Sequence, residues 1–237
     1  MKSQPSDKVF DFLKDIPNSD LEKPQVTLSY AQSIDGSLTW MRGQSTAISG
    51  PESMQLTHQL RAHHDAILVG IGTVLADDPQ LSVRLVKGDD PRPIILDSKL
   101  RIKSKARILN SGMKPWIFCA FGNEPNQIKV LENAGAKVFP VSQDDDGKLD
   151  ITEVLQITRK QGISTIMLEG GRALITSFLA LQLVDKTVIT IAPRFIGGLN
   201  VLDQRFGKSS KANFPTINPI EYEQLGKDLI LWGKLSY

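Results

Sequence analysis

Short apolar runs of strand type alternate along this chain with segments of helical periodicity, and this alternation restricts the fold more than any other feature of the sequence. Strands are predicted over residues 26–33, 66–69, 93–96, 116–120, 137–141, 164–168 and 184–191. Helices are predicted over 51–63 and 126–134, from Asp150 onward, and from Gly170-Gly171 to Leu181. Because strands that alternate with helices pair in parallel, the sequence predicts an α/β fold with a mostly parallel sheet.

The two ends of the chain add to this pattern. Residues 220–237 alternate between apolar and polar on both sides of Gly226-Lys227, which predicts an antiparallel hairpin and makes the sheet mixed. Val9, Phe12, Leu13 and Ile16 have helical spacing, so we expect a short amphipathic helix within an N-terminal extension, residues 1–24. No linker-like stretch divides the 237 residues, and we expect a single domain over 1–237.

Composition argues against several classes of protein. A net charge of +2 is too small to predict a nucleic-acid surface. The single cysteine, Cys119, rules out an internal disulfide framework and predicts a buried, inert thiol within an apolar strand. The apolar stretch 66–76 is too short to cross a bilayer, and charges interrupt every N-terminal apolar cluster, so we expect no membrane association and a cytoplasmic protein.

Two glycine-bearing strand ends are the best candidates for a binding site. Gly70 and Gly72 follow one buried strand, and Glu169-Gly170-Gly171 joins another to a helix. Glycines there let an anion approach the main-chain N–H groups, and ligands of α/β sheets bind at the carboxyl ends of strands. The alternative is that these glycines only permit tight turns, and neither stretch is a Walker A loop or a GxGxxG fingerprint.

Other polar residues offer little sign of hydrolytic or metal chemistry. The spacing of the three histidines is not that of a zinc helix, so we expect surface or helix-end positions for them and no metal site. The acidic run at 143–148 is interpreted as a solvated turn. Arg61 and Arg84 flank a buried strand, where two guanidinium groups would suit a phosphate or a carboxylate. The absence of a nucleophile and base pair is consistent with hydride transfer, in which a cofactor supplies the chemistry.

The stretches VTLSYAQSIDG (26–36), SGPESMQLTHQLRAHHDAILVGIGTVLADDPQLSVR (49–84), PRPIILDS (91–98) and IMLEGGRAL (166–174) together resemble the riboflavin-biosynthesis reductase family. The resemblance implies a dihydrofolate-reductase-like, three-layer α/β sandwich. It also implies reduction of the ribose of a phosphorylated ribosylaminopyrimidine to a ribityl chain with NADPH, by a homodimer. The zinc signature of the deaminase half of bifunctional members is absent.

The resemblance further implies a set of site residues. The cofactor positions are Ala31, Ala47, Thr73, Asp77, Ser98, Gly170, Gly171, Arg172, Ala173 and Leu174, with Lys99 and Arg101 as partners for a 2′-phosphate. The substrate positions are Ser45, Arg61, Leu81, Arg84 and Glu169. Asp35 and Glu169 are the catalytic candidates; Asp35 either orients the reacting ribose or stabilises its own turn, and Glu169 accepts hydrogen bonds from the pyrimidine's amino groups.

Two departures bear on the substrate. Bifunctional bacterial members usually carry a lysine where this chain has Ser29 and an aromatic residue where it has Ala47. The chain is therefore closer to the stand-alone fungal and archaeal reductases, which favours the 2,5-diamino-pyrimidinone over the deaminated 5-amino-uracil. A non-catalytic NADP-binding module and a pterin-type reductase on the same fold are the remaining alternatives.

Overall fold

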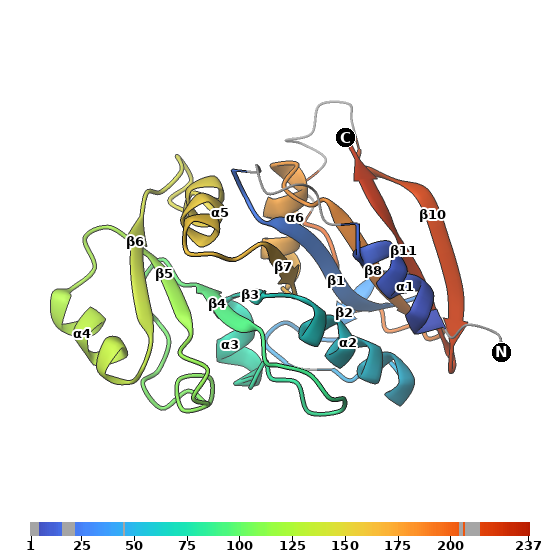
Figure 1. Cartoon of the computed structure of the whole chain (residues 1–237), viewed down its shortest axis with the longest axis horizontal. Helices are drawn as coiled ribbons and strands as arrows, with labels where there is room; N and C mark the ends of the chain where they lie inside the picture. Colours follow the sequence, from blue (N-terminus) through green and yellow to red (C-terminus); the bar gives the residue numbers. More distant parts are fainter. Residues whose placement is uncertain (1–4, 16–21, 45, 204–205, 207–213) are drawn as a thin grey trace.

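A nine-stranded sheet forms the middle layer of the protein (Figure 1). The computed structural model describes residues 5–15, 22–44, 46–203, 206 and 214–237. In spatial order the strands are β10 (Thr216–Leu225), β11 (Asp228–Ser236), β8 (Lys186–Ala192), β1 (Gln25–Ser33), β7 (Thr165–Leu168), β3 (Ala66–Gly70), β4 (Arg92–Leu96), β5 (Trp116–Ala120) and β6 (Lys137–Val141). Seven strands from β8 to β6 are parallel, and the C-terminal hairpin adds the antiparallel pairs β8–β11 and β11–β10.

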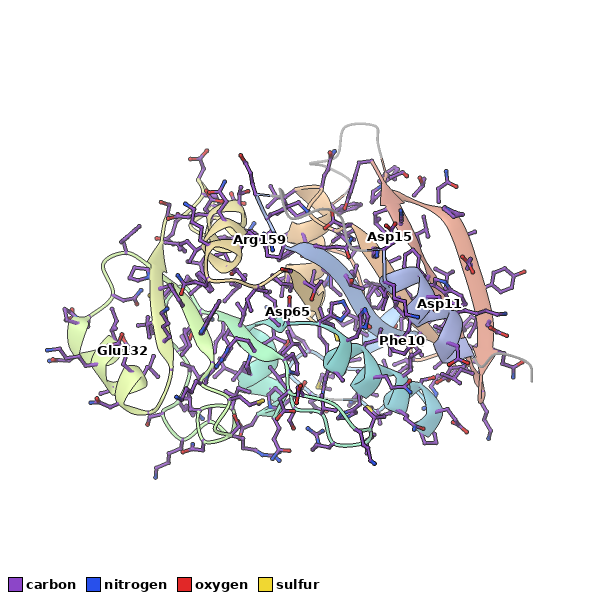
Figure 2. All side chains as sticks on the ribbon, viewed as in Figure 1. Phe10, Asp11, Asp15, Asp65, Glu132 and Arg159 are labelled. Carbon is purple, nitrogen blue, oxygen red and sulfur yellow. The ribbon has the colours of Figure 1, made fainter. Side chains whose placement is uncertain are left out.

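Helices cover both faces of this sheet and complete three layers. Neighbouring strand residues point to opposite faces. Leu168 of β7 packs in the cluster formed by α5 (Ile151–Lys160) and α6 (Arg172–Ala180), whereas Met167 packs with α1 (Pro5–Leu13) and α2 (Pro51–His63). On that second face α3 (Ile71–Asp77) and α4 (Pro125–Asn133) cover β3, β4 and β5. Figure 2 places Glu132 on α4 and Asp11 on α1 near opposite ends of the molecule.

Most predicted elements are confirmed, with ends that differ by one or two residues. The predicted helix 51–63 and the strands 116–120 and 137–141 coincide with α2, β5 and β6. Asp150 caps α5 as expected, because its carboxylate accepts hydrogen bonds from the N–H groups of Thr152 and Glu153. The spacing of Asp150 and Glu153 also predicts a capping box, in which the Glu153 carboxylate would accept from the N–H of Asp150. That half is wrong, since the Glu153 carboxylate accepts a hydrogen bond from the N–H of Ser142 instead. Cys119 is fully buried, and burial raises the pKa of its thiol to about 11.

Three features of the structure differ from the expectations or were missed by them. The glycine-threonine stretch after β3 is not a simple turn but the short helix α3, which ends where Asp78 takes a left-handed conformation. A second, two-stranded sheet pairs β2 (Ser37–Thr39) with β9 (Leu199–Asn200), segments too short to show a periodic pattern. The expectation of surface or helix-end positions for the histidines is wrong for His58, which is buried within α2; His63 is the last residue of α2, and His64 is its buried C-cap.

The N-terminal helix is held by a buried lysine. The amino group of Lys186 in β8 donates hydrogen bonds to the carbonyl oxygens of Phe12, Leu13 and Asp15, at 3.2, 3.2 and 2.6 Å. These carbonyls lie at the end of α1, where the helix dipole favours a cation. Val9 and Leu13 are buried as predicted, whereas Ile16 lies outside the described residues.

Candidate active site

The carboxyl ends of β1, β7, β3 and β4 meet at one edge of the sheet and bring the predicted site residues together (Figure 1). Parallel strands place all their carboxyl ends at the same edge, where ligands of α/β folds bind. Glu169 follows β7, Gly70 ends β3, and Ser98 follows β4 by two residues. The opposite edge is structural, since Asp65, labelled in Figure 2, accepts hydrogen bonds there from the N–H groups of Ser164 and Thr165.

Arg61 and Glu169 form a two-point ion pair beside the end of β7. The Nε and Nη2 atoms of Arg61 donate to the two carboxylate oxygens of Glu169, at 3.0 and 2.6 Å. The Arg61 side chain is only 9% exposed and that of Glu169 is 29% exposed. An ionised carboxylate offers about four acceptor positions, so the more exposed Glu169 retains the capacity to accept hydrogen bonds from a ligand.

Arg84 converges with Arg61 on one carbonyl oxygen. Nη1 of Arg61 donates to the main-chain oxygen of Ser82 at 3.2 Å, and Nη1 of Arg84 donates to the same oxygen at 3.4 Å. Nη1 of Arg84 also donates to the Ser82 hydroxyl at 2.9 Å, and Arg84 is an exposed residue. The two guanidinium groups therefore differ: that of Arg61 is buried and neutralised by Glu169, whereas Arg84 is an exposed residue that an anion could reach.

The two glycines after Glu169 have different environments. Gly171 is the N-cap of α6 with φ −80° and ψ 173°, so it has no left-handed strain, and a Cβ added there would meet only Thr73 Oγ1, at 3.8 Å. A Cβ added at Gly170 would lie 2.7 Å from Cδ2 of Leu174. The first N–H groups of a helix lack intrahelical acceptors, so open space at Gly171 suits a bound anion, whereas Gly170 permits close packing.

A cleft of about 960 Å³ opens next to this turn. It is lined by the start of α3, the end of β4, α6 and the loop before α5, and its volume is in the range of ligand-binding clefts. Of the predicted cofactor residues, Ser98, Ala173 and Leu174 line it, together with Arg101; Lys99 does not. The acidic run at 143–148 forms a turn, as predicted, in which Asp144 accepts hydrogen bonds from the N–H groups of Asp146 and Lys148, and this turn is one wall of the cleft.

Asp35 is engaged by its own surroundings. Its carboxylate accepts hydrogen bonds from the hydroxyls of Ser33 and Ser37 and from the N–H groups of Ile196 and Gly197. The Ser33 hydroxyl, followed by the Gly197 N–H, holds the pKa of Asp35 well below its usual range. Of its two predicted roles, this geometry favours the structural one, in which Asp35 ties the turn after β1 to the loop after β8.

The remaining predicted residues are spread around the same edge. Ala31 lies on β1, Ala47 is exposed, and Leu81 is buried with a positive φ of 56°. Arg172 donates to the carbonyl oxygen of Leu202, so its guanidinium is already engaged. Thr73 lies beside Gly171, whereas Asp77, the last residue of α3, does not line the cleft. Ser45 lies outside the described residues.

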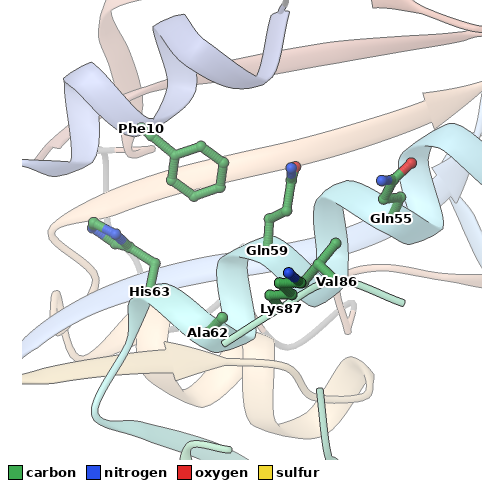
Figure 3. Close-up of a pocket in the computed structure, with 7 residues that line it drawn as sticks. All are labelled: Phe10, Gln55, Gln59, Ala62, His63, Val86 and Lys87. Carbon is green, nitrogen blue, oxygen red and sulfur yellow. The ribbon is translucent and has the colours of Figure 1, made fainter. Parts of the chain in front are cut away.

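Sequence reasoning missed one residue near the arginines. His58 is 1% exposed, and its Nδ1 accepts a hydrogen bond from the main-chain N–H of Arg84 at 3.0 Å. The only signal in the sequence was its position three residues before Arg61, which places both side chains on one face of α2. A shallower hollow of about 530 Å³ lies over a different face of α2, where Gln55, Gln59 and Ala62 contribute (Figure 3).

The described residues contain neither a candidate metal site nor a helix that could span a membrane. No group of three or more His, Cys, Asp or Glu side chains in those ranges could hold a metal ion. Across the same part of the chain, no helix has the length and apolar character needed to cross a membrane.

Comparisons with known proteins agree with this architecture. Residues 24–231 match the family model described as the RibD C-terminal domain. The chain is 35% identical to the 2,5-diamino-6-ribosylamino-4(3H)-pyrimidinone 5′-phosphate reductase of Eremothecium gossypii, over 95% of this chain and 94% of that protein. It is 34% identical to the riboflavin biosynthesis protein RibD of Aquifex aeolicus, over 90% of this chain but only 58% of that longer protein.

Solved structures show the same fold. The riboflavin biosynthesis reductase Rib7 of Saccharomyces cerevisiae superposes with a TM-score of 0.74 and 28% identity, over 97% of this chain and 100% of that one. A dihydrofolate reductase from Enterococcus faecalis superposes with a TM-score of 0.50 and 11% identity, over 89% and 96% of the two chains. The predicted dihydrofolate-reductase-like α/β sandwich is thus confirmed, and the chain belongs to the RibD C-terminal domain family.

Proposed function

We propose that this protein reduces the ribosyl group of a phosphorylated ribosylaminopyrimidine to the ribitylamino product, with NADPH, in riboflavin biosynthesis. The observation that carries the proposal is the position of the Arg61–Glu169 pair directly before the open turn at Gly171. One side of this turn offers charged groups to a phosphorylated pyrimidine, and the other offers a helix N-terminus and a cleft to a dinucleotide.

The accessible main-chain N–H groups beside the cleft suit the pyrophosphate of a dinucleotide. Nothing lies within 4 Å of a Cβ added at Gly72, and the only neighbour at Gly171 is the Thr73 hydroxyl, so main-chain N–H groups are accessible there. Gly171, Arg172 and Ala173 would hold the pyrophosphate, and Ser98 and Arg101 would face the adenosine end. NADPH, when bound, would supply the hydride for the reduction.

The chain's own residues would bind and orient the second substrate. Arg84, the exposed guanidinium, would pair with the phosphate. Glu169 would accept hydrogen bonds from amino groups of the pyrimidine, and Arg61 would fix the orientation of that carboxylate. Asp35 would act indirectly, by holding the loop at Ile196 and Gly197 against the end of β1. The reduction adds a hydride and a proton to the ribosyl group, which becomes the open ribityl chain.

We further infer that the 2,5-diamino-pyrimidinone is the preferred substrate. Relatives that are matched over most of their own length carry the name of the 2,5-diamino-pyrimidinone phosphate reductase. The test follows NADPH oxidation with the diamino compound and the deaminated compound side by side. Faster turnover of the deaminated compound would reverse the assignment, and no turnover of either would favour a non-catalytic NADP-binding module or a pterin-type reductase.

The homodimer and the cytoplasmic location stay predictions. Light scattering after size-exclusion chromatography of the purified protein checks the first, since a dimer has twice the chain mass of 26.2 kDa.

A further inference from the structure

The segment between α3 and β4, residues 79–91, is held in an unusual way. We call this segment the strap. Among the described residues, its main chain makes no hydrogen bond to any other main-chain group. Instead, two side chains of α2 form hydrogen bonds with the main chain of the strap, as a neighbouring strand would. Arg61 donates to the carbonyl oxygen of Ser82, and His58 accepts from the N–H of Arg84.

The strap also lies directly against α2. A Cβ added at Gly88 would come within 2.5 Å of the Cβ of Ala62, and φ at Gly88 is +156°. Figure 3 shows the strap at Val86 and Lys87 running alongside α2. Within the strap, the Asp90 carboxylate accepts a hydrogen bond from the N–H of Val83 at 2.6 Å. The position of Arg84 is therefore set mainly by α2.

We propose that His58 is a positioning residue, whose Nδ1 holds the main chain of Arg84 and thereby places the Arg84 guanidinium for the phosphate of the substrate. The inference rests on the proposed function, because it assigns the phosphate to Arg84. Since Nδ1 must be the acceptor, the ring is neutral and its proton is on Nε2. A protonated ring has no lone pair at Nδ1, so the contact with Arg84 would be lost on protonation.

The surroundings of His58 favour the neutral ring. The charged groups facing it are Arg61 on its own helix, Arg84 and Asp90 on the strap, and Glu169 after β7. Burial, followed by the two arginines, lowers the pKa of His58, and the two carboxylates oppose this. These surroundings therefore favour the neutral ring that the hydrogen bond to Arg84 requires.

The test compares His58→Leu, which removes the acceptor, with His58→Asn, whose side-chain oxygen can replace Nδ1. We expect His58→Leu to raise KM for the pyrimidine phosphate about tenfold, with kcat within about twofold and KM for NADPH unchanged, because one hydrogen bond is lost. Arg84→Ala should raise the same KM at least as much. His58→Asn should restore a KM within about threefold of the wild type.

Two further readouts separate positioning from general stability. Hydrogen exchange of the ligand-free protein should be faster across residues 79–91 in His58→Leu and near normal in His58→Asn. Below pH 6 the KM of the wild type should rise more steeply than that of His58→Asn, since the substrate phosphate titrates equally in both. If His58→Leu fails to fold, the hydrogen exchange and the pH profile of His58→Asn still test whether His58 positions Arg84.

Several outcomes would overturn the inference. These are an unchanged KM in His58→Leu, a KM defect that His58→Asn does not relieve, or parallel pH profiles of wild type and His58→Asn. Failure of the proposed function would look different. The wild type would then show no turnover, which removes the phosphate role of Arg84, while the exchange measurement would still report whether His58 holds the strap.

Discussion

The substrate side and the cofactor side of the Glu169-Gly170-Gly171 turn are built from different kinds of groups. On the substrate side, charged side chains already have hydrogen-bond partners: Arg61 donates to the carboxylate of Glu169, and the exposed Arg84 donates to the hydroxyl of Ser82. On the cofactor side, the turn and cleft present glycines, small side chains and a helix N-terminus. Both sides adjoin the same three residues. The substrate side depends on side chains that are distant in the sequence, whereas the cofactor side depends on the local main chain.

Burial explains this difference. A guanidinium that is 9% exposed must keep a counter-charge, because an unpaired buried charge is strongly unfavourable. Main-chain N–H groups at a helix start are neutral and need only space, which glycine provides. We therefore expect loss of a buried charged partner on the substrate side to affect folding and function together, and substitution at the open Gly171 on the cofactor side to affect binding alone. The predictions below test that contrast.

The largest effect is expected from Glu169→Leu, which leaves Arg61 buried without its partner. Removing one member of a buried pair costs about 3–5 kcal/mol, and we expect about 3 kcal/mol because Glu169 is partly exposed. Urea unfolding measures the change in the free energy of unfolding. The double variant Arg61→Met/Glu169→Leu is the matched control and should regain most of the loss. Equal stability of the single and double variants would show that the pair is not what stabilises this side.

Acid should next destabilise the C-terminal end of α2, which lies away from the site. All three histidines of the chain lie in or next to α2, and burial lowers the pKa of His64 to about 4. The folded pKa of His64 lies below the unfolded value of about 6.5. The contribution of His64 to the free energy of unfolding is therefore fully present above pH 6.5 and is lost as the pH falls to 4. The expected loss from His64 is about 3 kcal/mol, from about 1.4 kcal/mol per pKa unit.

Unfolding curves measured across pH 4–7 test this linkage. The control is His64→Asn, because the asparagine amide can donate to the Leu60 carbonyl oxygen in place of Nδ1 without titrating. The variant should show a shallower decrease in stability over that range. Parallel curves for the two proteins would mean that other groups account for the acid sensitivity.

Gly171→Val should separate binding from folding on the cofactor side. We expect at least a hundredfold weaker NADPH binding, because the branched side chain would stand over the N–H groups of α6, with a stability change no larger than about 1 kcal/mol. Gly170→Ala should do the reverse, losing about 1–3 kcal/mol of stability through its contact with Leu174 while the folded fraction binds NADPH. Thermal melts and cofactor titration of both variants measure the two quantities. Normal NADPH binding by Gly171→Val would restrict that glycine to a role in the turn.

The smallest effect concerns preference for NADPH over NADH. Arg101 lines the cleft beside Ser98, and its Nε lies 3.4 Å from the buried carboxylate of Asp97. We expect Arg101→Gln to weaken NADPH binding about tenfold and to leave NADH binding unchanged, because only NADPH carries the 2′-phosphate. Lys99→Gln is the control, since Lys99 is exposed outside the cleft. Calorimetric titration of both cofactors provides the affinities, and equal losses for NADPH and NADH would argue against a 2′-phosphate site.

Local features of the sequence determined a large part of this structure. The periodicity of apolar residues predicted α2, β5 and β6 at their observed bounds, and Asp150 predicted the start of α5. These features depend on neighbours within one or two turns of the chain, so they can be predicted without knowledge of the fold. The glycines at the ends of β3 and β7 predicted a site at the carboxyl ends of these strands, and the cleft beside Gly70 and Gly72 lies there.

The partners of the charged residues were decided only by the tertiary structure. Arg61 and Glu169 are 108 residues apart, and they meet because β7 inserts between β1 and β3, an order that no local pattern encodes. The contact between His58 and Arg84 likewise depends on the strap folding back over α2. Asp35 shows the same principle, since its carboxylate accepts hydrogen bonds from the N–H groups of Ile196 and Gly197, which lie far from it in the sequence. Periodicity predicts which residues are buried, but the counter-charge or hydrogen-bond partner of a buried polar group depends on which strands become neighbours.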